Sequence, residues 1–168
     1  MENKALDNAN FFAKLESHLK KKKISYFVIS FIIILLISAT LVFSNYKSNE
    51  NKKISEKYIL AGIYLASDNK DEAKLLYKEV IVSKNKFYSQ LALQNLLEHN
   101  LENNSNEIIK LFNIVENANQ DKDKLDLIKL KKALYLIKIS KKNEGEKLLQ
   151  EIISDNSIWK NIAEGLSR

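Results

Sequence analysis

A long uncharged segment divides the hydrophobic pattern of this chain into two parts. Ile24 to Phe43 are 20 consecutive residues without a charged side chain, and as a helix they would cover about 30 Å, the hydrocarbon thickness of a bilayer. A cleaved secretory signal has an apolar core of about 7 to 15 residues, whereas this run continues past Ser38 and Thr40, the small residues that could precede a cleavage site. A soluble core helix would need protein on every side, which the amphipathic rest of the chain does not supply. The pattern predicts an uncleaved transmembrane helix at residues 24–46.

Basic residues flank the two ends of the predicted span unequally. One end meets only Lys47, whereas four lysines directly precede the other: Lys20, Lys21, Lys22 and Lys23. Because basic flanks stay in the cytoplasm, we expect residues 1–23 to form a cytoplasmic tail, anchored at anionic lipid head groups, and residues 47–168 to be exported. Tyr26 and Tyr46 either anchor the helix at the two membrane interfaces or are ordinary aromatic residues of a long helix.

The sequence outside the span predicts an all-α protein. Apolar residues beyond it recur with a period near 3.6, and no segment alternates as a strand would. Residues 48–53 are either a helical extension or a short linker, and residues 2–19 are either a helix on the membrane surface or a frayed tail. The expected helices of the exported domain cover residues 54–66, 71–82, 87–97, 107–115, 125–139 and 144–153, with a last helix opening at Ile158.

Charge and composition narrow the classes of function. The net charge is +6, but residues 47–168, which we expect to be exported, hold 21 basic against 18 acidic side chains. This near balance argues against the basic surface of a nucleic-acid-binding protein. The chain contains no cysteine and no proline, so the fold cannot depend on disulfides and lacks one of the two strongest helix-breaking residues.

Residues suited to catalysis or metal binding are scarce. The only histidines, His18 and His99, fall on opposite sides of the predicted membrane, and His99 is best explained as a surface residue at a helix C-terminus. Residues 121–126, DKDKLD, lack the turn glycine of a calcium loop, and Lys132 stands at the position of its twelfth-residue glutamate. Other paired carboxylates stand at helix starts, where they cap free amides. We expect no enzymatic activity, no cofactor, no metal and no small-molecule substrate.

Small residues recur at a fixed separation within the predicted hairpins. The separation of Ala61 from Ala73 along the chain equals that of Ala133 from Gly145. Two antiparallel helices approach closely only where small side chains face each other. The large residues that accompany these positions are Leu60, Tyr64, Tyr77, Val80, Leu136, Leu149 and Ile152.

The first of these hairpins resembles a tetratricopeptide repeat (TPR). The matching residues are Leu60, Ala61, Tyr64, Ala73 and Tyr77, while Val80 stands at the last small position of the repeat. The later hairpins are degenerate, and the proline that often closes such a repeat is absent. The resemblance implies an irregular TPR-like solenoid of helical hairpins.

The order of parts resembles a bacterial family of ancillary Sec translocon subunits. The shared features are a short charged tail, one uncleaved span, a TPR-like domain and a late segment, SIWKNIAEGL, around Trp159. The resemblance implies a single-pass protein of the bacterial inner membrane, with its N-terminus cytoplasmic and its C-terminal domain periplasmic. It also implies binding to translocon subunits, periplasmic chaperones or exported substrates. Members of the family continue through further helices after the tryptophan segment, so the last helix here is expected to lack a partner.

These features predict a membrane-tethered adaptor for protein–protein interaction. In a TPR register, a partner would bind a groove lined by the first helix of each pair. The expected lining residues are Tyr58, Leu65, Leu93, Leu97, Leu130, Leu134 and Ile137. Each of them could instead belong to the core. The alternative function is a structural subunit, a scaffold within a larger membrane complex, in which Ile158, Trp159, Ile162 and Leu166 would be buried at a permanent contact.

Overall fold

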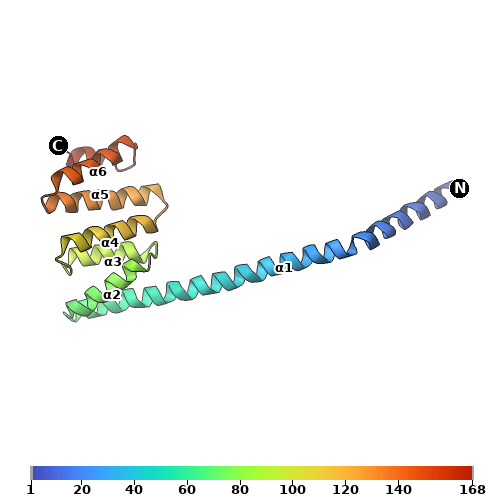
Figure 1. The fold of residues 1–168 in the computed structure, drawn as a ribbon, viewed down its shortest axis with the longest axis horizontal. Helices are drawn as coiled ribbons and strands as arrows, with labels where there is room; N and C mark the ends of the chain where they lie inside the picture. The colour runs from blue at the N-terminus through green and yellow to red at the C-terminus, as the bar shows by residue number, and fades with distance from the viewer. Residues whose placement is uncertain (1, 168) are drawn as a thin grey trace. The chain divides into compact units, whose positions relative to one another are not determined.

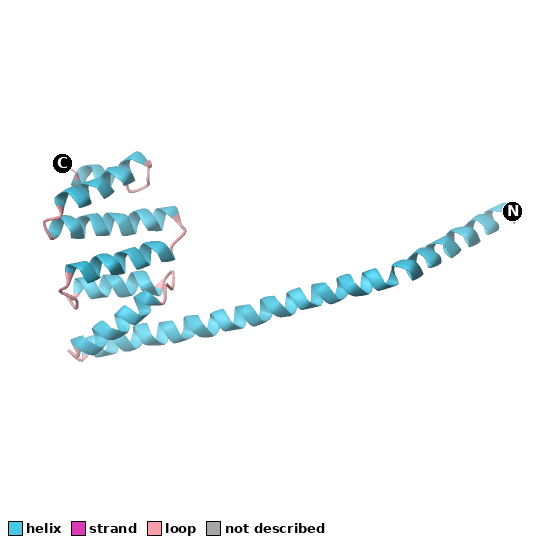
Figure 2. Cartoon of the chain, in the orientation of Figure 1, coloured by secondary structure: helices cyan, strands magenta, loops and turns pink. Residues whose placement is uncertain are grey.

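The computed structural model describes the backbone of residues 2–167 and the side chains of residues 29–167. The described residues form seven helices and no strand, so the prediction of an all-α protein is confirmed. Figure 2 shows these helices joined by short loops. Contacts divide the chain into two compact units, Met1–Asn49 and Glu50–Arg168.

The first unit belongs to one continuous helix, α1 (Glu2–Ala66). Of the two interpretations of residues 48–53, the helical extension is the observed one, since α1 passes through them without a break. Among the described residues, one segment, Ile29–Ala66, is long and apolar enough to cross a membrane by length and composition. The hydroxyls of Ser38 and Thr40 donate to the carbonyls of Leu35 and Ile37, at 2.9 and 2.7 Å. This bonding leaves neither hydroxyl unpaired on an apolar surface.

The predicted membrane anchors fall mostly outside the described side chains. This applies to Lys20, Lys21, Lys22, Lys23 and Tyr26. Tyr46 is described, and its ring is exposed.

The second unit is a stack of helices that starts with the end of α1. Figure 1 shows α2 to α6 following one another across this unit, and α7 packs on α6. The helices after α1 are α2 (Lys70–Val82), α3 (Tyr88–Glu98), α4 (Ser105–Ala118), α5 (Lys122–Lys138), α6 (Lys142–Ser154) and α7 (Lys160–Leu166).

Polar side chains cap several helix starts. Asn69, Asn104 and Asp121 are N-cap residues whose side chains accept hydrogen bonds from backbone amides of the first turn. Acidic residues stand in the first turns of α2, α4, α5 and α6, as the sequence predicted for residues such as Asp71. They complement the positive end of the helix dipole. His99 is the C-cap of α3 and is exposed, which confirms its predicted place.

Five helices are followed by a residue other than glycine in the left-handed backbone conformation. These residues are Asp68, Lys84, Asn100, Ser140 and Asn156, with φ between 48° and 65°. After α5, the amide of Ser140 donates to the carbonyl of Ile137 (3.1 Å) and the amide of Lys141 to that of Leu136 (2.9 Å). This is the Schellman arrangement, which satisfies carbonyls that the helix end would otherwise leave free.

Two hydrophobic clusters form the core of the second unit. The first lies among the end of α1, α2, α3 and α4 and includes Ile128 of α5, and its largest side chains are Tyr77 and Phe112. The second lies among α5, α6 and α7, around Leu149 and Ile152. Between α4 and α5, Lys132 bonds Glu116 at 3.0 Å.

The helix pair α1–α2 recurs along the chain as the pair α5–α6. The ion pair Lys57–Glu79 (2.6 Å) joins the first pair, and Lys129–Glu151 (3.3 Å) joins the second. The step in sequence from Lys57 to Lys129 equals that from Glu79 to Glu151, and we call it the recurrence offset.

The connections between helices recur at the same offset. Residues 67–69 link α1 to α2, and residues 139–141 link α5 to α6. After the second helix of each pair, Asn85 and Ser157 accept a hydrogen bond from the amide two residues on. The two helix pairs therefore share one local architecture.

Candidate partner-binding surface

The structure distributes the seven predicted groove residues between the core and the surface. Leu93 lies in the first cluster and Leu130 in the second, both buried. Three more, Leu65, Leu97 and Ile137, are half-buried against these clusters. Leu134, on α5, is exposed, at 41%. The groove stays a prediction, and Leu134 is its member most open to a partner.

Tyr58, the seventh residue, is held by polar and aromatic contacts. The side-chain amide of Asn95 donates to its hydroxyl at 3.0 Å. Its ring centroid lies 5.8 Å from that of Tyr77 and 5.5 Å from that of Tyr88. Burial raises the pKa of the Tyr77 phenol, and the neighbouring Tyr58 adds to this effect. Tyr58 therefore connects α1 to α2 and α3 and is anchored within the fold.

A small cleft lies among α3, α4 and α5. Leu93 and Leu97 line it together with Phe112 and Val115 of α4 and with residues of the first half of α5. Its volume of about 30 Å³ is an order of magnitude below the roughly 300 to 1,000 Å³ of small-molecule sites. This cleft is too small for a substrate of ordinary size. Among the side chains that the structure describes, no group of three acidic or histidine residues is placed to hold a metal.

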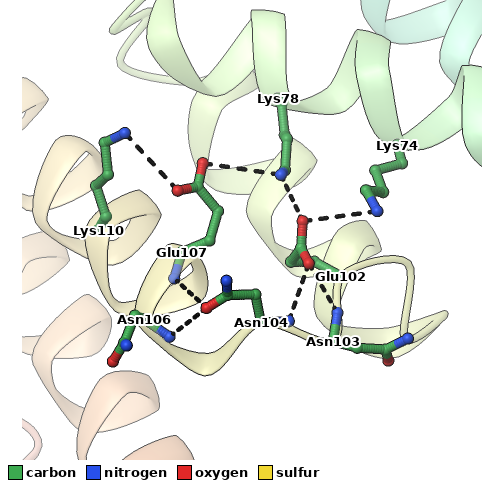
Figure 3. Close-up of polar contacts among 8 residues, drawn as sticks. All are labelled: Lys74, Lys78, Glu102, Asn103, Asn104, Asn106, Glu107 and Lys110. Carbon is green, nitrogen blue, oxygen red and sulfur yellow. Dashed lines mark hydrogen bonds and ion pairs between the residues drawn. The ribbon is translucent and has the colours of Figure 1, made fainter.

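An ion-pair cluster fixes the loop between α3 and α4 to α2 (Figure 3). The carboxylate of Glu102 accepts hydrogen bonds from Lys78 and, at 2.9 Å each, from the amides of Asn103 and Asn104. Lys74 lies 3.7 Å from it. Bonding to Lys78, followed by the backbone bond from Asn104, lowers the pKa of Glu102 to about 2. The side chain is only 9% exposed, so this carboxylate holds the loop as an internal group.

The cluster continues into α4. Glu107 lies 3.7 Å from Lys78 on α2 and 3.7 Å from Lys110 on its own helix. Asn104 closes the N-terminus of α4 by accepting bonds from the amides of Asn106 and Glu107. One group of side chains thus joins α2, the loop and the start of α4.

Replacing Glu102 with glutamine is expected to destabilise the second unit by about 1 to 2 kcal/mol, after allowance for solvent screening of the pairs. Because the folded pKa is lowered, the stabilisation is full above the unfolded value of 4.5 and is lost as pH falls toward about 2. Chemical unfolding of both proteins at pH 7 and pH 3 measures this, and the difference between them should shrink at pH 3. An equal difference at both pH values would contradict this role for the carboxylate.

Sequence reasoning missed two internal carboxylates. Glu102 stands in a polar stretch, LENN, that has the composition of an ordinary loop. Asp126 lies near the start of α5 and has the sequence signature of a surface residue, yet it is buried. Only the recurrence offered a signal, because the recurrence offset relates Asp126 to Ile54, an apolar residue that packs on the first cluster.

Trp159 fastens the last helix to the fold. Its indole Nε1 donates to the backbone carbonyl of Asp123 at 2.9 Å, and its ring packs on the second cluster. The other three residues of the predicted subunit contact, Ile158, Ile162 and Leu166, are exposed. The side chain of Trp159 is therefore bonded and packed within the chain, whereas the side chains of these three residues are open to solvent.

Comparison of this chain with protein-family models, curated proteins and solved structures found no match.

Proposed function

We propose that this protein is a membrane-tethered adaptor that binds other proteins through its helical stack. The observation that carries the proposal is the continuity of α1. This helix contains the apolar segment that begins at Ile29, and it also contains Tyr58 and Ala61, which pack in the core of the second unit. A partner-binding surface held near a membrane has a raised effective concentration for whatever emerges there.

We further propose that the stack is an irregular TPR-like solenoid. Support comes from the small residues Ala61, Ala73, Ala133 and Gly145, which are buried in the two helix pairs, and from the close approach of Gly145 to Ala133. The recurrence offset is close to twice the TPR period of about 34 residues. A solenoid of this kind presents the first helix of each pair to a partner, and Leu134 is exposed on such a helix.

The proposed location is a bacterial inner membrane with the stack in the periplasm, beside the Sec translocon. The four lysines before the apolar run support this orientation, and the resemblance in order of parts supports the translocon. A reporter enzyme that is active only outside the cytoplasm, fused after Arg168, should be active. Activity from the same reporter at the N-terminus instead would reverse the orientation.

Co-purification from membranes in mild detergent tests the adaptor role. Translocon subunits or periplasmic chaperones should accompany the full-length protein, and Leu134→Lys should reduce their recovery about 10-fold, the factor that about 1.4 kcal/mol gives. Leu75→Lys is the matched control, since Leu75 is exposed on α2, the second helix of its pair, and should leave recovery unchanged. A stable, monodisperse preparation that retains none of these proteins would refute the proposal.

A permanent structural role is the second candidate, favoured by the exposed apolar residues Ile158, Ile162 and Leu166 at the end of the stack. In that case, other polypeptides should co-purify in a fixed ratio that survives dilution. An adaptor should instead lose them progressively on dilution, because its complexes are reversible.

A further inference from the structure

The loop between α2 and α3, residues 83–87, carries an exposed aromatic side chain. The side chain of Phe87 is 63% exposed, and that of Val82, the last residue of α2, is 58% exposed. Two basic residues, Lys84 and Lys86, lie between them in the sequence. Both are exposed, and neither forms an ion pair within the described part of the chain. The loop therefore combines apolar and cationic surface.

Hydrogen bonds fix the conformation of this loop. The side-chain oxygen of Asn85 accepts bonds from the amides of Phe87 and Tyr88, at 3.1 and 3.0 Å. The hydroxyl of Ser89 donates to the carbonyl of Val80 at 3.0 Å, which ties the start of α3 to the end of α2. Tyr88 packs on the first cluster, whereas the preceding Phe87 is exposed on a turn that is itself well bonded.

The equivalent loop after α6 shows that the fold does not require these surface residues. The recurrence offset relates Lys84 to Asn156, which is uncharged. It relates Phe87 to Trp159, which is bonded and packed within the chain. The same local architecture is thus built with a neutral loop residue and a packed aromatic one. The cationic and exposed residues of loop 83–87 therefore serve something other than folding.

Contacts with α1 put this loop at the end of the second unit that is nearest, along the chain, to the apolar segment. The pair Lys57–Glu79 and the bond from the side-chain amide of Asn85 to Asn51 (2.8 Å) show that α2 runs back along α1. Asn51 follows Phe43, the end of the uncharged run, by eight residues, all within α1. Eight helical residues cover about 12 Å, a length set by the chain itself.

A bilayer surface has the chemistry that such a loop fits. Head groups extend about 5 to 8 Å beyond the hydrocarbon, so with Phe43 at the hydrocarbon boundary the loop is about one side-chain length from them. Aromatic side chains favour this interface, and lysines attract anionic head groups. No acidic residue occurs from Val80 to Leu97 to oppose that attraction.

We propose that loop 83–87 docks on the surface of the bilayer in which α1 is anchored. Phe87 and Val82 enter the head-group region, and Lys84 and Lys86 bind the phosphates of anionic lipids. The proposal rests on the membrane span of the proposed function, and it requires neither the adaptor role nor a particular orientation of the span. The docked loop gives the second unit a further attachment to the membrane and restricts its tilt over the lipid.

Fluorescence quenching in the full-length protein tests the docking, because the native chain has no cysteine to compete for a label. The variant Phe87→Cys, carrying a polarity-sensitive fluorophore, is reconstituted into nanodiscs of phosphatidylcholine with added phosphatidylglycerol. Its emission should be blue-shifted, strongly quenched by lipids with a nitroxide head group, and weakly quenched by aqueous iodide. The control is Ile63→Cys, since Ile63 is 56% exposed but lies further from the span along α1. Its label should show the opposite pattern.

Charge variants test the role of the two lysines. Replacing Lys84 and Lys86 with glutamine in the labelled protein should lower the ratio of docked to free loop about 5-fold per lysine, the factor that about 1 kcal/mol gives. The effect should appear only in nanodiscs that contain phosphatidylglycerol. A loss of equal size in phosphatidylcholine alone would contradict the binding of anionic lipid by these lysines.

Retention of the protein in nanodiscs through gel filtration tests the span separately. A protein that stays with the lipid, but whose label at residue 87 is as open to iodide as the label at residue 63, would overturn the docking and leave the membrane tether in place. A protein that separates from the lipid would overturn both.

Discussion

Replacing Gly145 with alanine is expected to destabilise the second unit by about 2 kcal/mol, the cost of overpacking a tight contact. A Cβ atom at this position would lie 2.8 Å from the carbonyl oxygen of Ala133 and 2.7 Å from Cγ1 of Ile137. Ile137 can shift, but the backbone of α5 can give way only if the helices separate. Overpacking of this kind costs about 1 to 3 kcal/mol and outweighs the helix propensity that alanine gains, about 1 kcal/mol. Valine, with two further methyl groups, should be worse.

The other two glycines are matched controls for this experiment. A Cβ at Gly62 would lie 3.8 Å from the Tyr77 hydroxyl oxygen, an ordinary contact, and a Cβ at Gly165 would meet nothing within 4 Å. Alanine at either position should therefore leave stability unchanged or raise it by up to about 1 kcal/mol. Thermal unfolding followed by circular dichroism measures all three, and about 2 kcal/mol corresponds to about 8 °C for a domain of this size. A Gly145→Ala protein as stable as the parent would show that the helix pair is not in close contact.

Replacing Asp126 with isoleucine is expected to stabilise the second unit by about 2 kcal/mol, because it removes an unsatisfied buried polar group. Asp126 is 3% exposed, and its Oδ2 atom has no hydrogen-bond partner among the described residues. Such an atom costs about 1 to 3 kcal/mol. The equivalent position in the first helix pair is Ile54, which packs against the first cluster, so the local architecture already accepts this side chain.

The substitution Asp126→Asn separates the effect of the carboxylate charge from the effect of burying more apolar surface. It keeps the size of the side chain and removes the carboxylate, so it should recover less of the stability than isoleucine, which also buries more apolar surface. Denaturant unfolding at pH 7 compares the three proteins. If both substitutions lower the midpoint, Asp126 stabilises the fold where it stands, and our account of its burial is wrong.

The helices were predictable because each one packs through an apolar face, and the residues of that face recur with the helical period. The period of 3.6 placed the helix 71–82 within one residue of α2, Lys70–Val82. The predicted helix 107–115 was short at both ends. The observed helix, α4, begins at Ser105 and ends at Ala118, and its terminal residues carry no periodic apolar signal. Residues 48–53 show the same limit, since a polar stretch without glycine or proline fits a helix and a linker equally.

The candidate site was less predictable, because period alone does not say which of two apolar faces a neighbouring helix covers. Leu130 and Leu134 lie one turn apart on α5, yet the first is buried in the second cluster and the second is exposed. The difference depends on where α6 crosses, which is set at the close approach of Gly145 to Ala133. Such a crossing is a tertiary property, and no residue on α5 alone reveals it.

The left-handed residues that follow five of the helices imply a reserve of stability that the chain has not used. An L-amino acid in this conformation costs about 1 kcal/mol, less for Asn or Asp, whereas glycine is nearly unstrained there. Ser140 and Lys84 hold two of these positions. Summed over five turns, the strain is a few kcal/mol, an appreciable fraction of the roughly 5 to 15 kcal/mol by which a domain remains folded. Evolution of this fold toward higher temperature therefore has an open route through its turns, with the core left untouched.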